Sequence, residues 1–469
     1  MLRPILRRLS HDHLEHWPSL IFKFMKKLLL LLPLAFAFFC GALPAHAGSN
    51  SRVPGQAVSN GISNGASKTA VGQNAASYTP LAGQSYKGTI LGYKVTVRPR
   101  NRRSETAWDI GAALAKPVAE GSAVLPIGSI YLWRHPDDFR LFRARLTVFD
   151  NNLFLSRSPA AIRPLEWVAT FENYTVPFPQ AQLVDGTALK SQELLWGYAM
   201  AGFGIGYRRQ VYPGKQDNML ALDLTAEPGY LFFGRGSRTA QDFVAPGDTF
   251  EVRGHLQFRL DELVRNILEL PHRGIAAGAD IIYGHRLKWS GWGINGYETG
   301  GRDYYLFTGY LVAAGGVPGL HSGRHRLIGA LHGGSGIGLD RFSVQRIGGG
   351  LNPMGEEYGS TWRPVLPGAV LQEFFPKRYI IATGEYRWEP VFFMYLGLNA
   401  SAAWLDRLRM EDGWPVDKDG FFSSLGARLT TGFLLHTRLQ LAYNYNFSVI
   451  RKGRYGGGEI VVSVAGSIR

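Results

Sequence analysis

Residues 438–448 read Arg-Leu-Gln-Leu-Ala-Tyr-Asn-Tyr-Asn-Phe-Ser, so that apolar residues alternate with polar or small ones over the stretch. Successive side chains of a β-strand point to opposite faces, and this strand would therefore have one apolar and one mainly polar face. Such a strand fits the wall of a barrel in lipid, with lipid on one side and polar groups on the other. The same alternation recurs in residues 142–148, 220–225 and 256–261.

The composition argues against a helical membrane protein. The chain has 469 residues, of which 45% are hydrophobic and 19% are charged, with 58 glycines and 21 tyrosines. Beyond the N-terminal region, no stretch offers the roughly 20 consecutive apolar residues that a spanning helix needs. We predict instead an all-β fold, a transmembrane antiparallel β-barrel of about sixteen strands.

The strand candidates all follow residue 87, and their even number allows an antiparallel barrel to close. They are residues 88–98, 122–134, 139–151, 163–175, 196–209, 218–235, 248–261, 275–290, 303–314, 324–334, 341–350, 377–389, 391–405, 420–432, 436–449 and 457–468. One or two soluble β-sandwiches are the alternative architecture. The chain length, the export signal and the high aromatic content without a disulfide framework argue against it.

The N-terminus carries the features of a Sec-type signal peptide. Lys26 and Lys27 precede an apolar run over residues 28–39, and Ala45 and Ala47 form a small-residue cleavage site. We expect translation to start at Met25 and cleavage to follow Ala47. The predicted organisation is a presequence over 1–47, a flexible periplasmic tail over 48–87 and an outer-membrane barrel over 88–469, in a Gram-negative cell.

Cys40 is the only cysteine and lies in this presequence, so the mature chain is expected to have no disulfide, thiolate chemistry or cysteine-based metal site. The whole chain has a formal charge of +15, most of which stays after cleavage. A basic exported protein could meet outer-membrane lipid and the phosphates of lipopolysaccharide; the alternative is basic loops and a basic lumen without a specific ligand. We expect no nucleic acid as a partner, and a monomer.

Two stretches resemble a known family. Residues 261–274 read Asp-Glu-Leu-Val-Arg-Asn-Ile-Leu-Glu-Leu-Pro-His-Arg-Gly, and residues 342–404 hold a Gly-Gly-Gly run, a long loop, Leu-Pro-Gly and Gly-Glu-Tyr-Arg-Trp in order. In both, the chain resembles the bacterial surface antigen superfamily, the BamA- and TamA-like outer-membrane barrels. The resemblance implies a 16-stranded barrel in which a long loop enters the lumen, with an arginine at its tip held by an acidic residue of an interior strand.

The chain departs from this family pattern at the loop tip. Arg363 could take the arginine position, but Pro364 stands where the family has glycine, and Asn399 stands near the place of the acidic residue. The lumen lock is then either rebuilt through Glu356 or Glu357, or absent, with Arg363 as an exposed loop residue in the second case. Residues 48–87 are also too few and too polar for the periplasmic substrate-receiving (POTRA) domains of the family.

Three functions remain open. The first is a non-enzymatic role in protein or lipid assembly or translocation at the outer membrane. It predicts an unstable seam between a first strand at residues 91–97 and a last strand at 460–468, with Gly456, Gly457 and Gly458 as its hinge. The second is a passive or gated pore.

The third function is a lipid hydrolase that uses His332 and Ser335. Residues three apart on a strand point to opposite faces, which argues against this pair. His321 and His325 have the spacing of a helical metal pair, but they lie among glycines and arginines. We therefore predict no catalytic residue, no metal and no cofactor.

Overall fold

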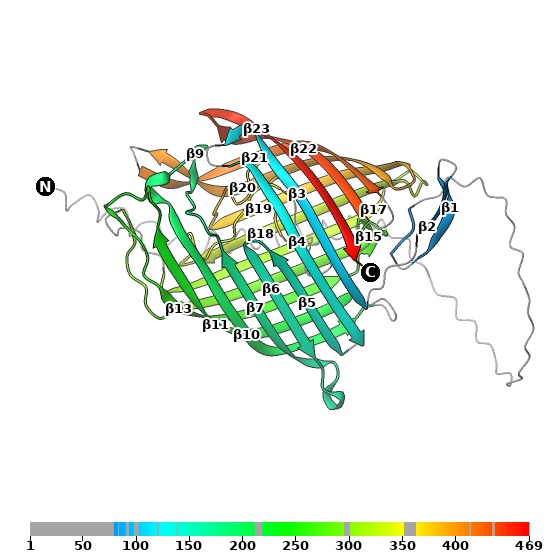
Figure 1. Cartoon of the computed structure of the whole chain (residues 1–469), viewed down its shortest axis with the longest axis horizontal. Helices are drawn as coiled ribbons and strands as arrows, with labels where there is room; N and C mark the ends of the chain where they lie inside the picture. Colours follow the sequence, from blue (N-terminus) through cyan, green and yellow to red (C-terminus); the bar gives the residue numbers. More distant parts are fainter. Residues whose placement is uncertain are drawn as a thin grey trace, which may run out of the picture. The chain divides into compact units, whose positions relative to one another are not determined.

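The structure is a computed structural model. It describes residues 79–82, 84–90, 93–97, 103–119, 122–137, 139–211, 218–294, 301–350, 363–411, 414–433 and 437–468. The predicted presequence therefore lies outside the described residues, as does most of the predicted tail. Within the described residues, sixteen long strands form one antiparallel ring, which closes where the last strand pairs with the first (Figure 1). The predicted all-β antiparallel barrel of about sixteen strands is confirmed.

The barrel strands follow one another in chain order around the ring. They are β3 (Ser104–Ala119), β4 (Ser122–Asp137), β5 (Arg140–Thr147), β6 (Asp150–Arg157), β7 (Leu165–Thr175), β10 (Leu194–Gln210), β11 (Met219–Arg235), β13 (Thr249–Asp261), β15 (Pro271–Arg286), β17 (Asp303–Gly316), β18 (His325–Ile337), β19 (Arg378–Val391), β20 (Met394–Glu411), β21 (Trp414–Phe433), β22 (Thr437–Arg451) and β23 (Arg454–Ile468).

The remaining elements are short. They are the strands β1 (Tyr86–Ile90), β2 (Tyr93–Val97), β8 (Leu183–Val184), β9 (Thr187–Ala188), β12 (Phe243–Val244), β14 (Val264–Arg265) and β16 (Gly293–Ile294), with the 3₁₀ turns η1 (Ala160–Ile162) and η2 (Lys190–Gln192). In the part of the chain that the structure describes, no helix is long and apolar enough to span a membrane.

Two predicted barrel strands were wrong. Residues 88–98 contribute to the separate β1–β2 hairpin, and residues 341–350 lie in the connection between β18 and β19. Their places in the ring are taken by β3 and β6, which the sequence analysis missed. Alanine and glycine recur along β3, and β6 begins Asp-Asn-Asn and has only eight residues, so the apolar alternation is weak in both.

The two faces of the wall differ as the alternation predicts. On β11, Leu222 and Leu224 are exposed on the outer face, whereas Asp223 and Thr225 are buried on the inner face. The polar residues on the inner face of these strands are buried or half-buried in the structure. They include Arg143, Arg145, Glu166, Glu172, Asp223, Gln257, Arg259, Arg438, Gln440, Asn444 and Asn446. An apolar outside around a polar inside is the arrangement of a membrane barrel.

The barrel has two mouths, which we name by the chain. The terminal mouth is the one at which β3 begins and β23 ends, and the distal mouth is the opposite one. The longest connections lie at the distal mouth: residues 176–193, 236–248, 287–302 and 338–377. Connections at the terminal mouth are shorter.

Candidate functional site

The connection between β18 and β19 is residues 338–377, and we call it the inner loop. Its described parts, 338–350 and 363–377, fold into the barrel. Its described residues Phe342, Ile347 and Ala369 are at most 3% exposed. Backbone hydrogen bonds join its two described arms, including Ile347 N–H to the carbonyl of Phe374 at 2.9 Å. Since no barrel strand forms from these arms, their burial comes from the surrounding wall and from each other. We call these two described arms the plug.

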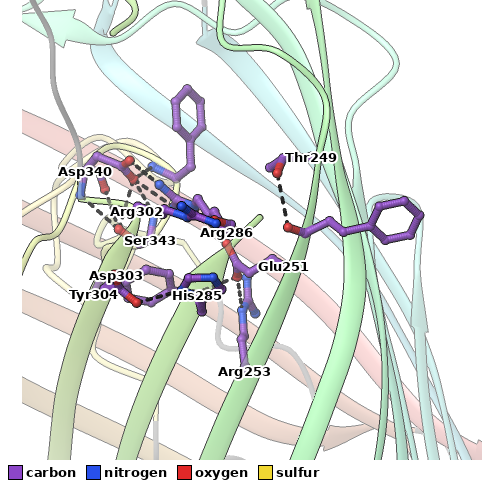
Figure 2. A network of polar contacts seen from close by, with 12 residues as sticks. Thr249, Glu251, Arg253, His285, Arg286, Arg302, Asp303, Tyr304, Asp340 and Ser343 are labelled. Carbon is purple, nitrogen blue, oxygen red and sulfur yellow. Dashed lines mark hydrogen bonds and ion pairs between the residues drawn. The ribbon is translucent and has the colours of Figure 1, made fainter. Parts of the chain in front are cut away.

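The first anchor of the inner loop is an ionic network at the distal end of β13 and β15, shown in Figure 2. Arg286 donates to Asp340 of the inner loop at 2.5 and 3.2 Å and to Glu251 at 2.9 Å. Glu251 also accepts hydrogen bonds from Arg253 at 2.5 Å and from the Tyr304 hydroxyl at 2.8 Å. Two arginines and two carboxylates balance in charge, and such pairing is what lets ions stay buried.

An aromatic cluster beside this network holds Phe342 of the inner loop. The ring centroid of Phe342 lies 5.0 Å from Trp196, 4.8 Å from Phe233 and 5.1 Å from Trp292. Tilted and edge-on contacts at these distances are favourable for aromatic pairs and add to the burial of the ring. Residues 341–350 were predicted as a strand because of their apolar residues, and here the Phe342 side chain packs into a lumen cluster instead.

Arg363, the predicted lock residue, lies in the lumen and is about one quarter exposed. Its guanidinium donates to Asp150 of β6 at 2.7 Å, and Arg145 of β5 donates to the other oxygen of the same carboxylate at 2.8 Å. Burial lowers the pKa of Arg363 but the Asp150 carboxylate raises it, with a net rise above its ordinary value. Glu356 and Glu357, the predicted partners, lie outside the described residues.

The sequence offered no signal for Asp150 as a partner of Arg363. Asp150 opens β6, a strand that the analysis missed, and it is 213 residues from Arg363. Asn399, which occupies the place of the family's acidic residue, is 3.4 Å from the side chain of Asn444 instead. A pair between two such distant residues can be found only once the strand register is known.

The second arm of the inner loop is anchored on β22 and β23. Arg451 of β22 makes two hydrogen bonds of 2.6 Å to Glu373, and both side chains are almost fully buried. On β23, Glu459 accepts the backbone N–H of Gly368 at 3.2 Å. Asn446 donates to the carbonyl of Pro367 at 3.1 Å. The inner loop therefore contacts both sides of the lumen, and one of these sides is the wall next to the barrel closure.

The closure joins β23 to β3 through eleven register pairs, from Gly458↔Lys116 to Ile468↔Thr106. The prediction that residues 91–97 form the first barrel strand at this seam was wrong, because Tyr93–Val97 pairs with β1 outside the ring. The strand partner of this short segment is β1, within the same hairpin, and not a strand of the ring. The strand that pairs with β23 is β3.

Gly456, Gly457 and Gly458 lie near the start of β23, opposite a register shift in β22. Gly456 has a φ of 105°, and a Cβ there would lie 2.1 Å from the hydroxyl of Tyr445. A Cβ at Gly458 would lie 2.9 Å from the hydroxyl of Tyr443. At Gly456 the backbone angle therefore favours glycine.

A second distal connection, residues 176–193, reaches over this closure, and we call it the crossing loop. It leaves β7 and returns at β10, yet its Asp185 lies 2.6 Å from Arg409 of β20 and accepts the Met410 N–H at 3.1 Å. Leu183 packs with Ala115 of β3. A Cβ at Gly186 would lie 2.3 Å from the carbonyl of Ile450 on β22. The crossing loop thus contacts strands on both sides of the β23–β3 closure.

The terminal mouth is crossed by residues 262–270, which belong to the first stretch that resembles the family. Asn266 donates to the Tyr395 hydroxyl of β20 at 2.8 Å, and the carbonyl of Leu268 accepts from Arg438 of β22 at 3.1 Å. Thr79 joins this region from the N-terminal side, donating from its backbone and its hydroxyl to Glu389 at 2.8 and 2.6 Å. Both mouths therefore carry chain segments that span several strands of the ring.

Neither hydrolytic nor metal chemistry is favoured by the described residues. His332 is buried and stacks against Tyr310, whereas Ser335, on the same strand, is exposed, so the pair does not form a nucleophile and base. No group of three or more His, Cys, Asp or Glu residues in the described part could hold a metal ion.

Comparison with known proteins gives similarity at the level of structure. No family model matches the chain, and no curated protein matches it in sequence. Similar solved structures include BamA from Haemophilus ducreyi lacking POTRA domains 1–3, with 12% identity and a TM-score of 0.44 over 83% of this chain and 76% of that chain. CdiB from Acinetobacter baumannii has 10% identity and a TM-score of 0.44 over 83% and 66% of the two chains. CdiB from Escherichia coli has 10% identity and a TM-score of 0.41, over 82% of this chain and 67% of that chain.

At these identities and TM-scores, the fold assignment rests on the strand pairings of the chain itself.

Proposed function

We propose that the protein is an outer-membrane β-barrel of the surface antigen type, exported through a Sec-type signal and surrounded by outer-membrane lipid. The apolar outer face supports this. Phe203 and Ile205 of β10, Leu398 of β20 and Phe421 of β21 are each more than 60% exposed. Large apolar side chains are exposed on every strand of the ring, and a soluble monomer rarely exposes large apolar patches. Recovery of the mature chain in the soluble periplasmic fraction would contradict the proposal.

Within this setting, we propose a non-enzymatic role in the assembly or translocation of protein or lipid. One observation carries it: the plug is fastened to the strands of the closure. Glu373 is paired with Arg451 on β22, and Gly368 is bonded to Glu459 on β23. Separation of β23 from β3 moves these anchors, so release of the plug and opening of the wall are coupled.

Two further features support opening of the wall at the β23–β3 closure. The crossing loop contacts strands on both sides of it, so it is a strap that must release before the wall opens. Gly456, Gly457 and Gly458 act as the hinge about which the start of β23 bends, because glycine has the widest backbone freedom. Arg363 belongs to the plug that closes the resting barrel. We expect a monomer, with lipid and lipopolysaccharide as its surroundings and exported proteins as its clients.

A crosslink across the closure tests this role. Val461 is the register partner of Ala113 on β3 and of Ala442 on β22, so it can be tied to either side. The variant Ala113→Cys/Val461→Cys seals the closure, and the matched control Ala442→Cys/Val461→Cys ties two strands within the wall. Each is compared with the wild type and with a deletion strain by quantitative proteomics of purified outer membranes.

We expect the deletion strain to lose other barrel or surface proteins selectively from its outer membrane. The sealed variant should reproduce this loss and recover under reducing conditions, while the control variant should behave as the wild type. An unchanged proteome in the deletion strain would contradict the assembly role. If the sealed variant and its control support the same outer-membrane proteome, the barrel does not act by separating β23 from β3.

A gated pore is the second candidate, and the polar lumen favours it. A cavity of about 290 Å³ remains between the inner loop and the wall, and arginines, tyrosines and carboxylates line it. Polar lumens of this kind can conduct solutes when the plug moves. Planar-bilayer recordings of the wild type distinguish the two roles: discrete opening steps under applied voltage indicate a gated pore, and their absence at every voltage argues against one.

A further inference from the structure

We propose that this lumen cavity is a binding site for a small anionic solute, whose carboxylate or phosphate group is held by Arg346. The inference goes beyond an assembly role, since it concerns a ligand of the closed barrel and does not require the closure to open. It rests on the cavity, on the charge of its lining and on the contacts of Arg346.

The cavity lies between the inner loop and the wall formed by β4, β5, β6, β7, β10, β13, β15, β17 and β19. Its volume of about 290 Å³ is at the lower end of the roughly 300–1,000 Å³ common for small-molecule sites. The solute must therefore be small. Tyrosine hydroxyls and amide groups face the cavity beside the charged groups, so a solute with hydroxyls of its own would find hydrogen-bond partners there.

The charge of the lining is strongly positive. Six arginines line the cavity: Arg143, Arg145, Arg253, Arg259, Arg346 and Arg363. Three carboxylates do so: Asp150, Glu172 and Asp280. With histidine neutral, the lining has three positive charges in excess. An enclosed space with low-dielectric walls focuses such a field and attracts anions.

Most of these arginines already have acidic partners. Arg259 makes two hydrogen bonds of 3.0 Å to Asp280, and Arg253 pairs with Glu251. Arg145 and Arg363 share the single carboxylate of Asp150. With Glu251 counted among the partners, six arginines face four carboxylates, and two positive charges remain in excess.

Arg346 differs from these arginines. Its guanidinium lies 3.7 Å from the ring centroid of Tyr174 and 4.4 Å from that of Trp196, and no hydrogen bond or ion pair joins it to another described residue. The Tyr174 hydroxyl lies 3.0 Å from the amide oxygens of Gln180 and Gln372, which fixes the ring beneath it. Stacking leaves the N–H donors at the edge of the guanidinium plane unused.

The geometry of a stacked guanidinium suits an oxyanion. Its N–H groups form a planar fork that matches two oxygens of a carboxylate or phosphate, and such charge-assisted pairs are the stronger hydrogen bonds. A half-buried arginine without a carboxylate is costly to keep in a closed lumen, and a bound anion removes that cost. A neutral solute would leave the excess charge uncompensated.

Isothermal titration calorimetry on the full mature chain, purified in detergent micelles, tests the site. The probes are inorganic phosphate and glucuronate, which present the two oxyanions, with glucose as the neutral counterpart of glucuronate. The variant Arg346→Gln removes the charge. The matched control Arg140→Gln removes an exposed arginine that pairs with Asp137 at the terminal mouth, outside the cavity.

We expect the wild type to bind phosphate, glucuronate or both, and not glucose. Binding should weaken at least tenfold in Arg346→Gln and stay unchanged in Arg140→Gln. The stronger probe identifies the source of the oxyanion as a phosphorylated or a carboxylated solute. Wild type that binds neither anion, glucose binding equal to that of glucuronate, or unaltered affinity in Arg346→Gln would each overturn the proposal.

Folding of each variant is checked by the heat-dependent shift of the barrel in gel electrophoresis. Where Arg346→Gln does not fold, Arg346→Lys serves in its place. It keeps the charge and loses the planar fork, so we expect a weakened affinity, and an affinity equal to the wild type would overturn the role of the fork. The binding measurement does not depend on activity in the membrane, so its outcome is separate from that of the assembly experiment.

Discussion

Substitution of Glu373 by alanine should release the second arm of the inner loop. The Arg451 side chain is fully buried and Glu373 is 4% exposed, and two hydrogen bonds of 2.6 Å join them. Glu373 also accepts the backbone N–H of Val370 at 2.8 Å. The variant therefore leaves a buried guanidinium and a buried N–H group without this partner.

Removal of one partner from a buried ion pair costs about 3–5 kcal/mol. Each 1.4 kcal/mol changes an equilibrium tenfold, so the ratio of docked to undocked loop should fall by roughly 150- to 4,500-fold. Exchange of both residues for methionine removes the uncompensated charge and should restore much of the docking, since such replacements are often neutral.

A single cysteine can report this equilibrium, because the sequence has no cysteine besides Cys40. Ala369 in the inner loop is fully buried, and Ala369→Cys in a chain without Cys40 should react with a maleimide only when the loop undocks. We expect Glu373→Ala to raise the labelling rate by two orders of magnitude or more in purified, folded protein.

The matched control is Glu411→Ala, which breaks the pair of Glu411 with Lys418 at 2.9 Å. Both of these side chains are half exposed. Exposed pairs contribute only about 0–1 kcal/mol, so labelling at Ala369→Cys should barely change. Equal labelling rates in the Glu373→Ala protein and its parent, or an equally large effect in the Glu411→Ala control, would refute the view that the buried pair holds the plug.

Three further outcomes are expected. Leu398→Arg, on the outer face, should destabilise the barrel in liposomes by roughly 2–4 kcal/mol if the position lies near the bilayer midplane, and unchanged unfolding in urea would argue against lipid contact there. Gly456→Ala should lower the temperature of the gel-shift transition more than Gly384→Ala, because only the former residue has a positive φ and a crowded Cβ position; equal shifts would contradict this. Phe342→Ala should cost about 3–5 kcal/mol and raise the same maleimide labelling, and wild-type labelling would show that the aromatic cluster does not hold the loop.

The barrel could be predicted from the sequence because alternation is a local property. The polar residues 438, 440, 444 and 446 lie on one face of their strand whatever the rest of the chain does, and the structure has them all on the inner face. Where the alternation was diluted, as by the alanines of β3, prediction failed. Residues 341–350 were wrongly predicted as a barrel strand. A loop that packs inside a barrel also carries buried apolar residues, so its sequence can look like that of a strand.

The anchors of the plug could not be predicted for a different reason. Asp150 and Arg363 are 213 residues apart, and Glu373 and Arg451 are 78 apart. Each pair forms only because the inner loop crosses the lumen to strands that are distant in the sequence. Charge alone does not choose among many arginines and carboxylates; the strand register and the path of the loop do.

Planar-bilayer recordings of the wild type, and of a variant in which a short Gly-Ser linker replaces most of residues 338–377, measure the role of the inner loop most directly. We predict little steady conductance for the wild type and a large, stable, ohmic conductance for the variant, because the arms that cross the lumen are gone. Equal conductance of the two proteins, both folded and inserted to the same extent, would contradict a barrel that is closed by this loop.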